Sequence, residues 1–138
     1  MNKLAIAVKK SSKGLSKMLP IIAGVVLLVG VIKTVTPTSL YTGLFQKNIL
    51  VDSLIGASLG SFLTGNAATS YIIGGELMDK GIDLFPVTAF LVSWVTVGLV
   101  QLPAETVLGK NFAIFRNISS FILSIAVAAM TVWIMGIL

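Results

Sequence analysis

The distribution of charge constrains this chain more than any other feature, because long stretches carry no charged side chain. Only 11% of the 138 residues are charged and 56% are hydrophobic, whereas soluble domains usually carry about a quarter charged residues. Four charge-free intervals divide the sequence: residues 18–32, 53–75, 84–104 and 117–138. A helix needs about 20 apolar residues to cross the hydrocarbon core of a bilayer. The pattern therefore predicts an all-α integral membrane protein with three to four transmembrane helices.

The positive charges suggest how such a protein is organised. Five of the ten Lys and Arg residues lie within residues 1–17, which predicts a Lys-rich cytoplasmic tail that orients the chain and binds anionic lipid. A single transmembrane domain is expected over residues 18–138, in a multi-pass protein of the cell membrane. Its predicted spans are 18–36, 49–79, 84–104 and 117–138. A cleaved signal peptide is the less favoured alternative, because Lys33 stands where cleavage would be expected.

The residue types that are missing exclude several functions. The chain contains no Cys and no His, so thiolate or imidazole metal ligands and Cys- or His-based catalysis are ruled out. The five acidic residues, Asp52, Glu76, Asp79, Asp83 and Glu105, do not suggest an activated nucleophile or an acid–base pair. We therefore expect no enzyme activity, catalytic residue, metal or cofactor. The net charge of +5 is accounted for by the tail, so we expect no nucleic-acid partner.

The second predicted span is the informative one, because it is too long for a simple crossing. Residues 49–79 would form a helix of about 45 Å at 1.5 Å per residue, and the segment is rich in glycine. A break is expected at Thr64, Gly65 and Asn66, where Gly65 tolerates positive φ and Asn66 is a good N-cap for a following helix. The segment then either crosses as a broken helix or re-enters as a hairpin.

Such a break predicts a functional site. Backbone that leaves helical geometry at membrane depth must be buried in protein or face water, and transporters use half-helix ends there to hold substrates and ions. The candidate pathway residues are Thr64, Gly65, Asn66, Thr69, Ser70, Gln101 and Glu105. Gly56 and Gly60, which precede the break, are expected to serve close helix packing instead.

The charged residues near the ends of the intervals have two possible roles each. Glu105 is expected at the membrane interface, although a position within the membrane would make it functional. Arg116 is expected to anchor the start of the last helix, and an ion pair with Glu105 is the alternative. A solvated loop with a turn at Gly81 is expected to contain Glu76, Asp79, Lys80 and Asp83.

Charge bias and size together suggest the assembly. Counting Lys and Arg on each side favours the hairpin with three crossings over four crossings. This preference depends on the tail, so insertion in both orientations stays open. Three or four short helices enclose too little space to shield a polar pathway. We therefore expect a homodimer, parallel or antiparallel, with the site at the interface of the two copies.

Residues 61–77 have the sequence SFLTGNAATSYIIGGEL, and the runs VTAF, WVTVG and QLPAE follow later in the chain. Together these segments resemble half-length members of the permeases related to the organoarsenical efflux permeases. The resemblance covers roughly residues 55–117, and full-length members resemble two such units in tandem. It implies a polytopic permease with its site at the glycine-rich break. Arsenical exporters carry a cysteine-containing motif there, where this chain has TGNAAT. A small anion or neutral polar solute fits hydroxyls, an amide and helix N-termini better than arsenic does.

The sequence thus predicts a permease half-unit that moves a small solute or ion through a homodimer interface near residues 64–70. Its expected partners are a second copy, membrane lipids and the transported solute. One alternative is a non-transporting membrane scaffold or anchor subunit, in which Gly65 and Asn66 would pack without an aqueous pocket. Another is a small ion channel, since Gly60-Ser61-Phe62 is faintly similar to dual-topology fluoride channels, although their threonine-phenylalanine-serine motif is missing.

Overall fold

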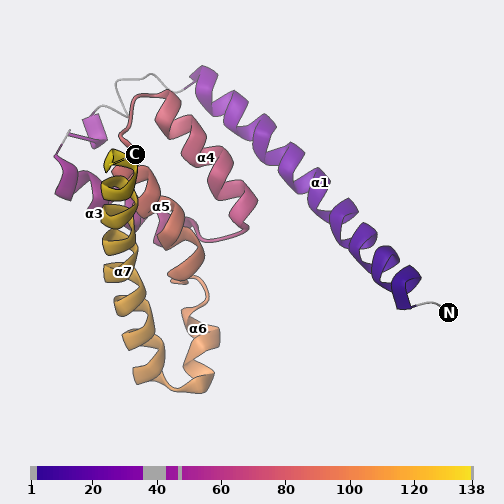
Figure 1. The fold of residues 1–138 in the computed structure, drawn as a ribbon. Coiled ribbons are helices and arrows are strands. Elements are labelled where there is room, and N and C mark those ends of the chain that lie inside the picture. The colour runs from indigo at the N-terminus through magenta and orange to yellow at the C-terminus, as the bar shows by residue number, and fades with distance from the viewer. Residues whose placement is uncertain (1–2, 36–42, 47, 138) are drawn as a thin grey trace. The chain divides into compact units, whose positions relative to one another are not determined.

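The computed structural model describes residues 3–35, 43–46 and 48–137, and the regular elements within them are all helical (Figure 1). The elements are α1 (Lys3–Val35), α3 (Ile49–Leu63), α4 (Ala67–Asp79), α5 (Leu84–Thr96), α6 (Leu102–Glu105), the 3-10 turn η1 (Thr106–Leu108) and α7 (Lys110–Ile137). The predicted all-α fold class is confirmed. The chain divides into two units; α1 belongs to the first, and α3 to α7 belong to the second.

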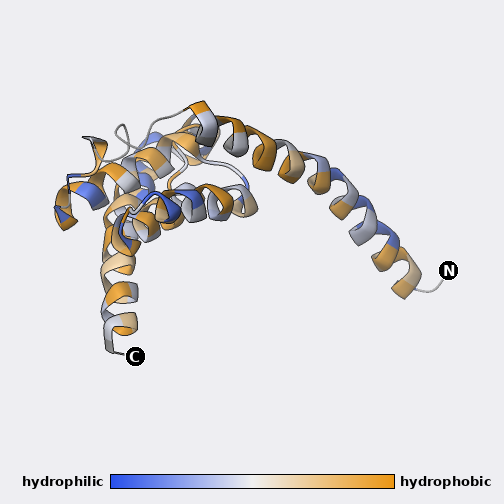
Figure 2. Ribbon diagram, turned by 90° about the horizontal axis from the view of Figure 1, so that it is seen from above, coloured by the Kyte–Doolittle hydropathy of each residue, from blue (hydrophilic) through white to orange (hydrophobic). Residues whose placement is uncertain are grey.

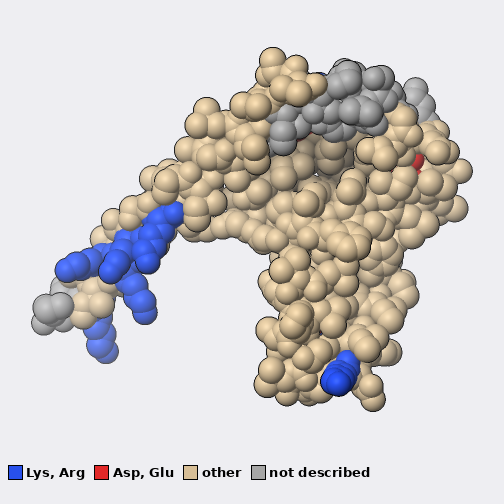
Figure 3. Space-filling view, turned by 180° about the vertical axis from the view of Figure 1, so that it is seen from behind, with Lys and Arg blue, Asp and Glu red and all other residues tan. Residues whose placement is uncertain are grey.

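Helix α1 carries both the basic tail and the first apolar segment without interruption. Its lysines lie at positions 3, 9, 10, 13 and 17, and steps of three, four and seven residues keep them on one side of the helix. Figure 3 shows this basic group in blue. Among the described residues, two helices are long and apolar enough to cross a membrane, Lys3–Leu28 and Lys110–Gly136. This is compatible with a membrane protein.

Helices α3 and α5 pack closely through two glycines. A Cβ atom added at Gly56 would overlap the backbone carbonyl of Pro86, and one added at Gly60 would overlap the carbonyl of Phe90 and the hydroxyl of Ser93. Glycine at these positions therefore lets the two backbones approach to a distance that no side chain permits. The predicted packing role of Gly56 and Gly60 is confirmed.

The same contacts show that α3 and α5 are parallel and that the chain reverses between α3 and α4. Gly56 lies at Pro86, near the start of α5, and Thr64 reaches Trp94, near its end. In α4 the order is opposite, because α4 begins just after Thr64 yet Gly74 lies against Val87 nearer the start of α5. Helices α3 and α4 thus form a hairpin, whose turn at residues 64–66 lies beside the carboxyl end of α5.

The core of this unit centres on α5. One buried cluster contains Phe45, Leu77, Ile82, Val87, Phe90 and Trp94. A second, formed by Ala57, Ala89 and Ala128, joins α3, α5 and α7. Helix α7 runs antiparallel to α5, because Ala128 packs near Ala89 while Asn117 bonds the backbone of Gly98 beyond the end of α5.

Two predicted spans have different bounds in the structure. The segment 84–104 is not one helix, because α5 ends at Thr96 and the short α6 follows, with Pro103 in its first turn, a position where a helix tolerates proline. The last helix begins at Lys110 rather than at 117, after Gly109 with φ +126° ends the preceding turn. Arg116 therefore lies inside α7 and does not open it.

The expected loop between the second and third intervals is also shorter than predicted. Glu76 and Asp79 belong to α4, because the helix continues to Asp79. Only residues 80–83 connect α4 to α5. Gly81, with φ +84°, forms the predicted turn, a conformation that glycine adopts without steric cost.

Candidate functional site

The hairpin turn between α3 and α4 has the predicted capping geometry. Helix α3 ends at Leu63 and α4 begins at Ala67, so the break lies at the three predicted residues. The side-chain oxygen of Asn66 accepts a hydrogen bond of 2.8 Å from the backbone N–H of Ala68. Asn66 is therefore the N-cap of α4, as its residue type predicts.

Gly65 has a different role from the one expected. Its φ is not positive, since the positive-φ glycines of the described residues are Gly81 and Gly109. A Cβ atom at Gly65 would instead lie 3.5 Å from Cζ2 and 3.7 Å from Nε1 of Trp94. The missing side chain of Gly65 thus leaves space beside the nitrogen-bearing edge of this indole.

Trp94 is a site residue that the sequence reasoning missed. It is 4% exposed and packs against the ring of Phe90 with centroids 5.4 Å apart. Its Nε1 is buried and has no hydrogen-bond partner among the described residues. Buried indole N–H groups usually find a partner, so the unpaired nitrogen distinguishes Trp94 from the other core residues. No pattern in the sequence distinguished Trp94 from a core residue.

The turn leaves backbone donors unpaired as well. The N–H groups of Thr69 and Ser70 both donate to the carbonyl of Asn66, at 3.1 and 3.3 Å. Within the described part of the chain, the N–H groups of Gly65, Asn66 and Ala67 make no hydrogen bond. Three consecutive donors at the amino end of α4 are therefore unpaired, and the first belongs to Gly65, beside the Trp94 indole.

A second polar cluster joins α6 to α7. Arg116 forms an ion pair with Glu105, so the alternative role of Arg116 is the one observed. Asn117 is 4% exposed and donates to Glu105 Oε2 at 2.7 Å and to the Ala113 carbonyl at 2.9 Å. Its side-chain oxygen accepts from the backbone N–H of Gly98 at 2.9 Å. All the hydrogen-bonding capacity of this amide nitrogen is used within the protein.

The hairpin turn and the Glu105 cluster each donate a hydrogen bond to the carboxyl end of α5. The last carbonyls of a helix have no partner within the helix, so these bonds satisfy them. The Thr64 hydroxyl donates to the Trp94 carbonyl at 2.9 Å from one side. Arg116 Nη2 donates to the Thr96 carbonyl at 3.4 Å from the other. The end of α5 therefore places the hairpin turn and the Glu105 cluster around one point of the fold.

Five of the seven candidate pathway residues lie at this turn: Thr64, Gly65, Asn66, Thr69 and Ser70. The Ser70 hydroxyl is committed to the Ala67 carbonyl at 2.7 Å. Glu105 lies in the second cluster. Gln101 is exposed in the α5–α6 connection, and its carbonyl accepts from the N–H groups of Ala104 and Glu105. The structure thus gives Gln101 a role in starting α6.

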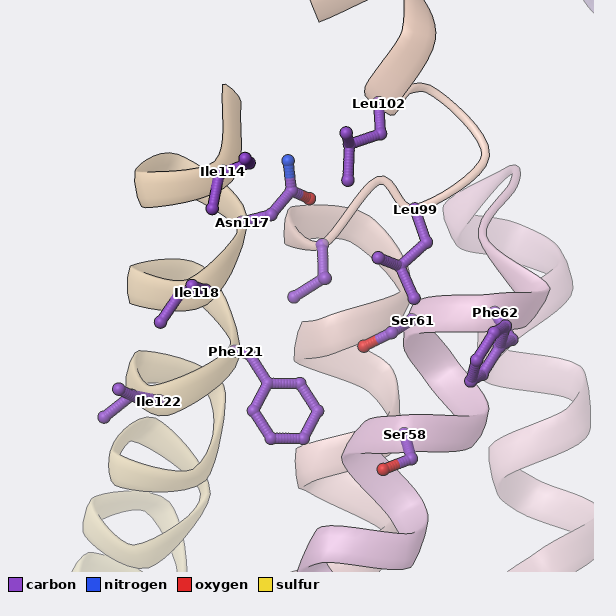
Figure 4. A pocket seen from close by; sticks show the side chains of 11 residues that line it. Ser58, Ser61, Phe62, Leu99, Leu102, Ile114, Asn117, Ile118, Phe121 and Ile122 are labelled. Carbon is purple, nitrogen blue, oxygen red and sulfur yellow. The ribbon is translucent and has the colours of Figure 1, made fainter. Parts of the chain in front are cut away.

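An open pocket of about 370 Å³ lies between α3, the α5–α6 connection and α7 (Figure 4). Its lining is almost entirely apolar, and α7 contributes Ile118 and Phe121. The hydroxyl of Ser61 is engaged with the Ala57 carbonyl, and the Asn117 amide is engaged as described above. The pocket therefore suits an apolar side chain or an acyl chain better than a polar solute.

The surface of α7 is strongly apolar. Phe115, Ile122 and Trp133 are 74%, 61% and 70% exposed. Figure 2 shows the hydrophobic colouring along most of α7, and Figure 3 shows a face of this unit that is largely uncharged. Exposed apolar surface of this extent needs lipid or a protein partner to cover it.

Within the described residues, no group of three acidic side chains could hold a metal ion. No protein-family model, curated protein or solved structure matches the chain.

Proposed function

We propose that the protein is one half of a membrane permease, in which two copies enclose a pathway for a small solute or ion at the α3–α4 turn. The observation that carries the proposal is the reversal at residues 64–66, which leaves three consecutive backbone donors unpaired and brings Gly65, the first of them, next to the buried, unpaired Trp94 Nε1. A buried hydrogen-bond donor without a partner costs free energy of folding, so these donors favour a site that binds a polar solute.

Helix lengths support a re-entrant hairpin. Helices α3 and α4 contain 15 and 13 residues, which gives about 22 and 20 Å at 1.5 Å per residue. Both are shorter than the hydrocarbon core of about 30 Å, whereas α7, with 28 residues, can cross it. The turn lies beside the end of α5, where Gly98 bonds Asn117 inside the apolar stretch Lys110–Gly136. In a membrane this arrangement puts the turn at hydrocarbon depth.

Exposure at the turn supports a dimer. Phe62 and Tyr71, which flank the turn, are 69% and 68% exposed, and Gly65 is exposed between them. Lipid cannot satisfy unpaired N–H groups at this depth. A second copy can cover the turn and leave water on its polar side. The homodimer therefore shields the pathway that one copy leaves open.

The resemblance to half-length permeases related to the organoarsenical efflux permeases agrees with this assignment. It centres on residues 61–77, which contain the turn and most of α4. Thr64, Gly65 and Asn66 stand where arsenical exporters have a cysteine-containing motif, so no thiolate is available to bind arsenic. A small anion or neutral polar solute suits the donors at the turn.

The proposal is tested by uptake into proteoliposomes that contain the purified full-length chain. The probes are radiolabelled phosphate, sulfate, acetate, glycerol and rubidium, and the variants are Asn66→Ala and, as a control on the same helix, Gly75→Ala, where a Cβ meets nothing within 4 Å. We expect uptake of at least one probe by the wild type and Gly75→Ala, and loss of that uptake in Asn66→Ala. Uptake no faster than in empty liposomes for every probe would overturn the proposal.

A scaffold subunit is the second candidate, and the apolar pocket between α3 and α7 favours it. A pocket lined by Ile118 and Phe121 can receive a side chain from a partner helix. The scaffold requires a stable complex with another membrane protein and no flux. Uptake that depends on Asn66 in a preparation containing this chain alone would exclude it.

A further inference from the structure

The turn of the α3–α4 hairpin combines two independent features that both require a hydrogen-bond acceptor. The first is the amino end of α4, a helix of 13 residues, where Gly65, Asn66 and Ala67 leave their N–H groups unpaired. The second is the Trp94 indole, which belongs to another helix and is 4% exposed. Its Nε1 has no partner among the described residues.

The space beside Gly65 connects these features. The position that a Cβ of Gly65 would take lies 3.7 Å from Trp94 Nε1 and 3.8 Å from the Leu63 carbonyl oxygen. An acceptor atom near this position comes within hydrogen-bonding reach of the indole after a shift of less than about 1 Å. The same position belongs to Gly65, whose backbone N–H is the first of the unpaired donors before α4. Four donors at this turn thus have no partner, the indole Nε1 and the N–H groups of residues 65–67, which favours a ligand rich in acceptor atoms.

We propose that this turn is a binding site for a small oxyanion, with Trp94 Nε1 and the N–H groups of residues 65–67 as the donors. An oxyanion offers several acceptor oxygens to several donors at once, and the helix dipole of α4 adds a partial positive charge at its amino end. Backbone donors at the end of a half-helix are the groups that bind anionic substrate groups in transporters. The inference rests on the proposed permease function and names its substrate class.

Two substitutions should impair anion binding at the turn without disrupting the fold. Gly65→Ala places a methyl group beside the indole, at ordinary contact distance from Trp94 Cζ2, and Gly65 has no positive φ, so the fold tolerates it. The methyl occupies the space that the anion needs. Trp94→Phe keeps an aromatic ring in the core and removes the N–H. Gly75→Ala is the matched control, because a Cβ there meets nothing within 4 Å.

Binding is measured without transport by the fluorescence of Trp94. The chain has two tryptophans, and Trp133→Phe, at a position 70% exposed on α7, leaves Trp94 as the single reporter. The full-length protein in detergent is titrated with sodium phosphate, sulfate, nitrate and acetate, with sodium chloride holding the ionic strength. We expect a saturable change in Trp94 emission with at least one oxyanion. Gly65→Ala should weaken the apparent affinity about tenfold or more, the effect of losing one hydrogen bond to a charged group, and Gly75→Ala should leave it unchanged.

Trp94→Phe is tested by thermal unfolding, since it lacks the reporter. The oxyanion that changes the emission should raise the Tm of the wild type, and this rise should be smaller in Trp94→Phe. An emission that responds to none of the four oxyanions, or that responds equally in Gly65→Ala, would overturn the inference. If the protein transports a probe but binds none of the oxyanions, the inference of an oxyanion site fails and the permease proposal stands. Anion binding that depends on Gly65 without any flux supports the site and defeats the permease proposal.

Discussion

The hydroxyl of Thr64 donates a hydrogen bond of 2.9 Å to the backbone carbonyl of Trp94, a residue thirty positions further along the chain. This bond joins the turn of the α3–α4 hairpin to the carboxyl end of α5. It satisfies a carbonyl that α5 cannot pair internally. It also ties the turn to the residue whose indole lies beside Gly65.

Thr64→Val should destabilise the fold, because valine has the shape of threonine without the hydroxyl and leaves the Trp94 carbonyl unpaired. The expected loss is about 1 kcal/mol of unfolding free energy, measured by thermal unfolding of the purified protein. Thr64→Ser keeps the hydroxyl and should lose less. Equal stability of Thr64→Val and the wild type would show that the bond does not hold the turn.

Gly60→Ala should destabilise the packing of α3 on α5. The added methyl overlaps the Phe90 carbonyl and the Ser93 hydroxyl, and overpacking of this kind costs about 1–3 kcal/mol. Gly75→Ala on α4 meets no atom within 4 Å and is the control. Thermal unfolding measures both variants. A Gly60→Ala protein as stable as Gly75→Ala would contradict the parallel α3–α5 contact.

Asn117→Ala should lower stability by about 1–3 kcal/mol, because it leaves the buried Gly98 N–H without its acceptor and removes one of the two side chains that donate to Glu105. Asn111, on the same helix, is exposed, and Asn111→Ala should change stability little. Thermal unfolding again provides the comparison. If the two alanine variants unfold at the same temperature, the Asn117 network contributes nothing to the fold.

Membrane topology should follow the hairpin. With α3–α4 re-entrant, residues 11 and 79 lie on opposite sides of the membrane, whereas a broken helix that crosses puts them on the same side. A chain with both Ser11→Cys and Asp79→Cys is labelled in sealed cells with an impermeant maleimide, and mass spectrometry counts the labels per molecule. We expect one label per molecule, even if the chain inserts in both orientations. Molecules with two labels would contradict the hairpin.

Local sequence chemistry was enough to predict the break and its cap. Thr64, Gly65 and Asn66 interrupt an apolar segment with a short polar run, and the N-cap preference of Asn66 depends on its own side chain and the next amides. The spacing of Gly56 and Gly60 on one helix face likewise predicted close packing. The ion pair of Glu105 and Arg116 stood as an alternative, since opposite charges near two neighbouring segments can meet.

The remaining features depend on contacts between distant segments. The end of α5 at Thr96 is fixed by side chains of Thr64 and Arg116 that come from other helices, and the apolar composition of 84–104 gives no sign of it. Trp94 looks like a core residue in the sequence, because only the placement of Gly65 beside its nitrogen makes it a site residue. The reversal of α4 is also a matter of tertiary packing.

The central claim is that the turn faces an aqueous pathway, and thiol accessibility at Asn66 tests it most directly. The chain has no cysteine, so Asn66→Cys introduces a single thiol, and Leu123→Cys, at an apolar position 60% exposed on α7, is the control. Both variants are treated in native membranes with a charged methanethiosulfonate reagent supplied from both sides. The account predicts modification at position 66 and protection at position 123. Protection of position 66 in folded protein would contradict it.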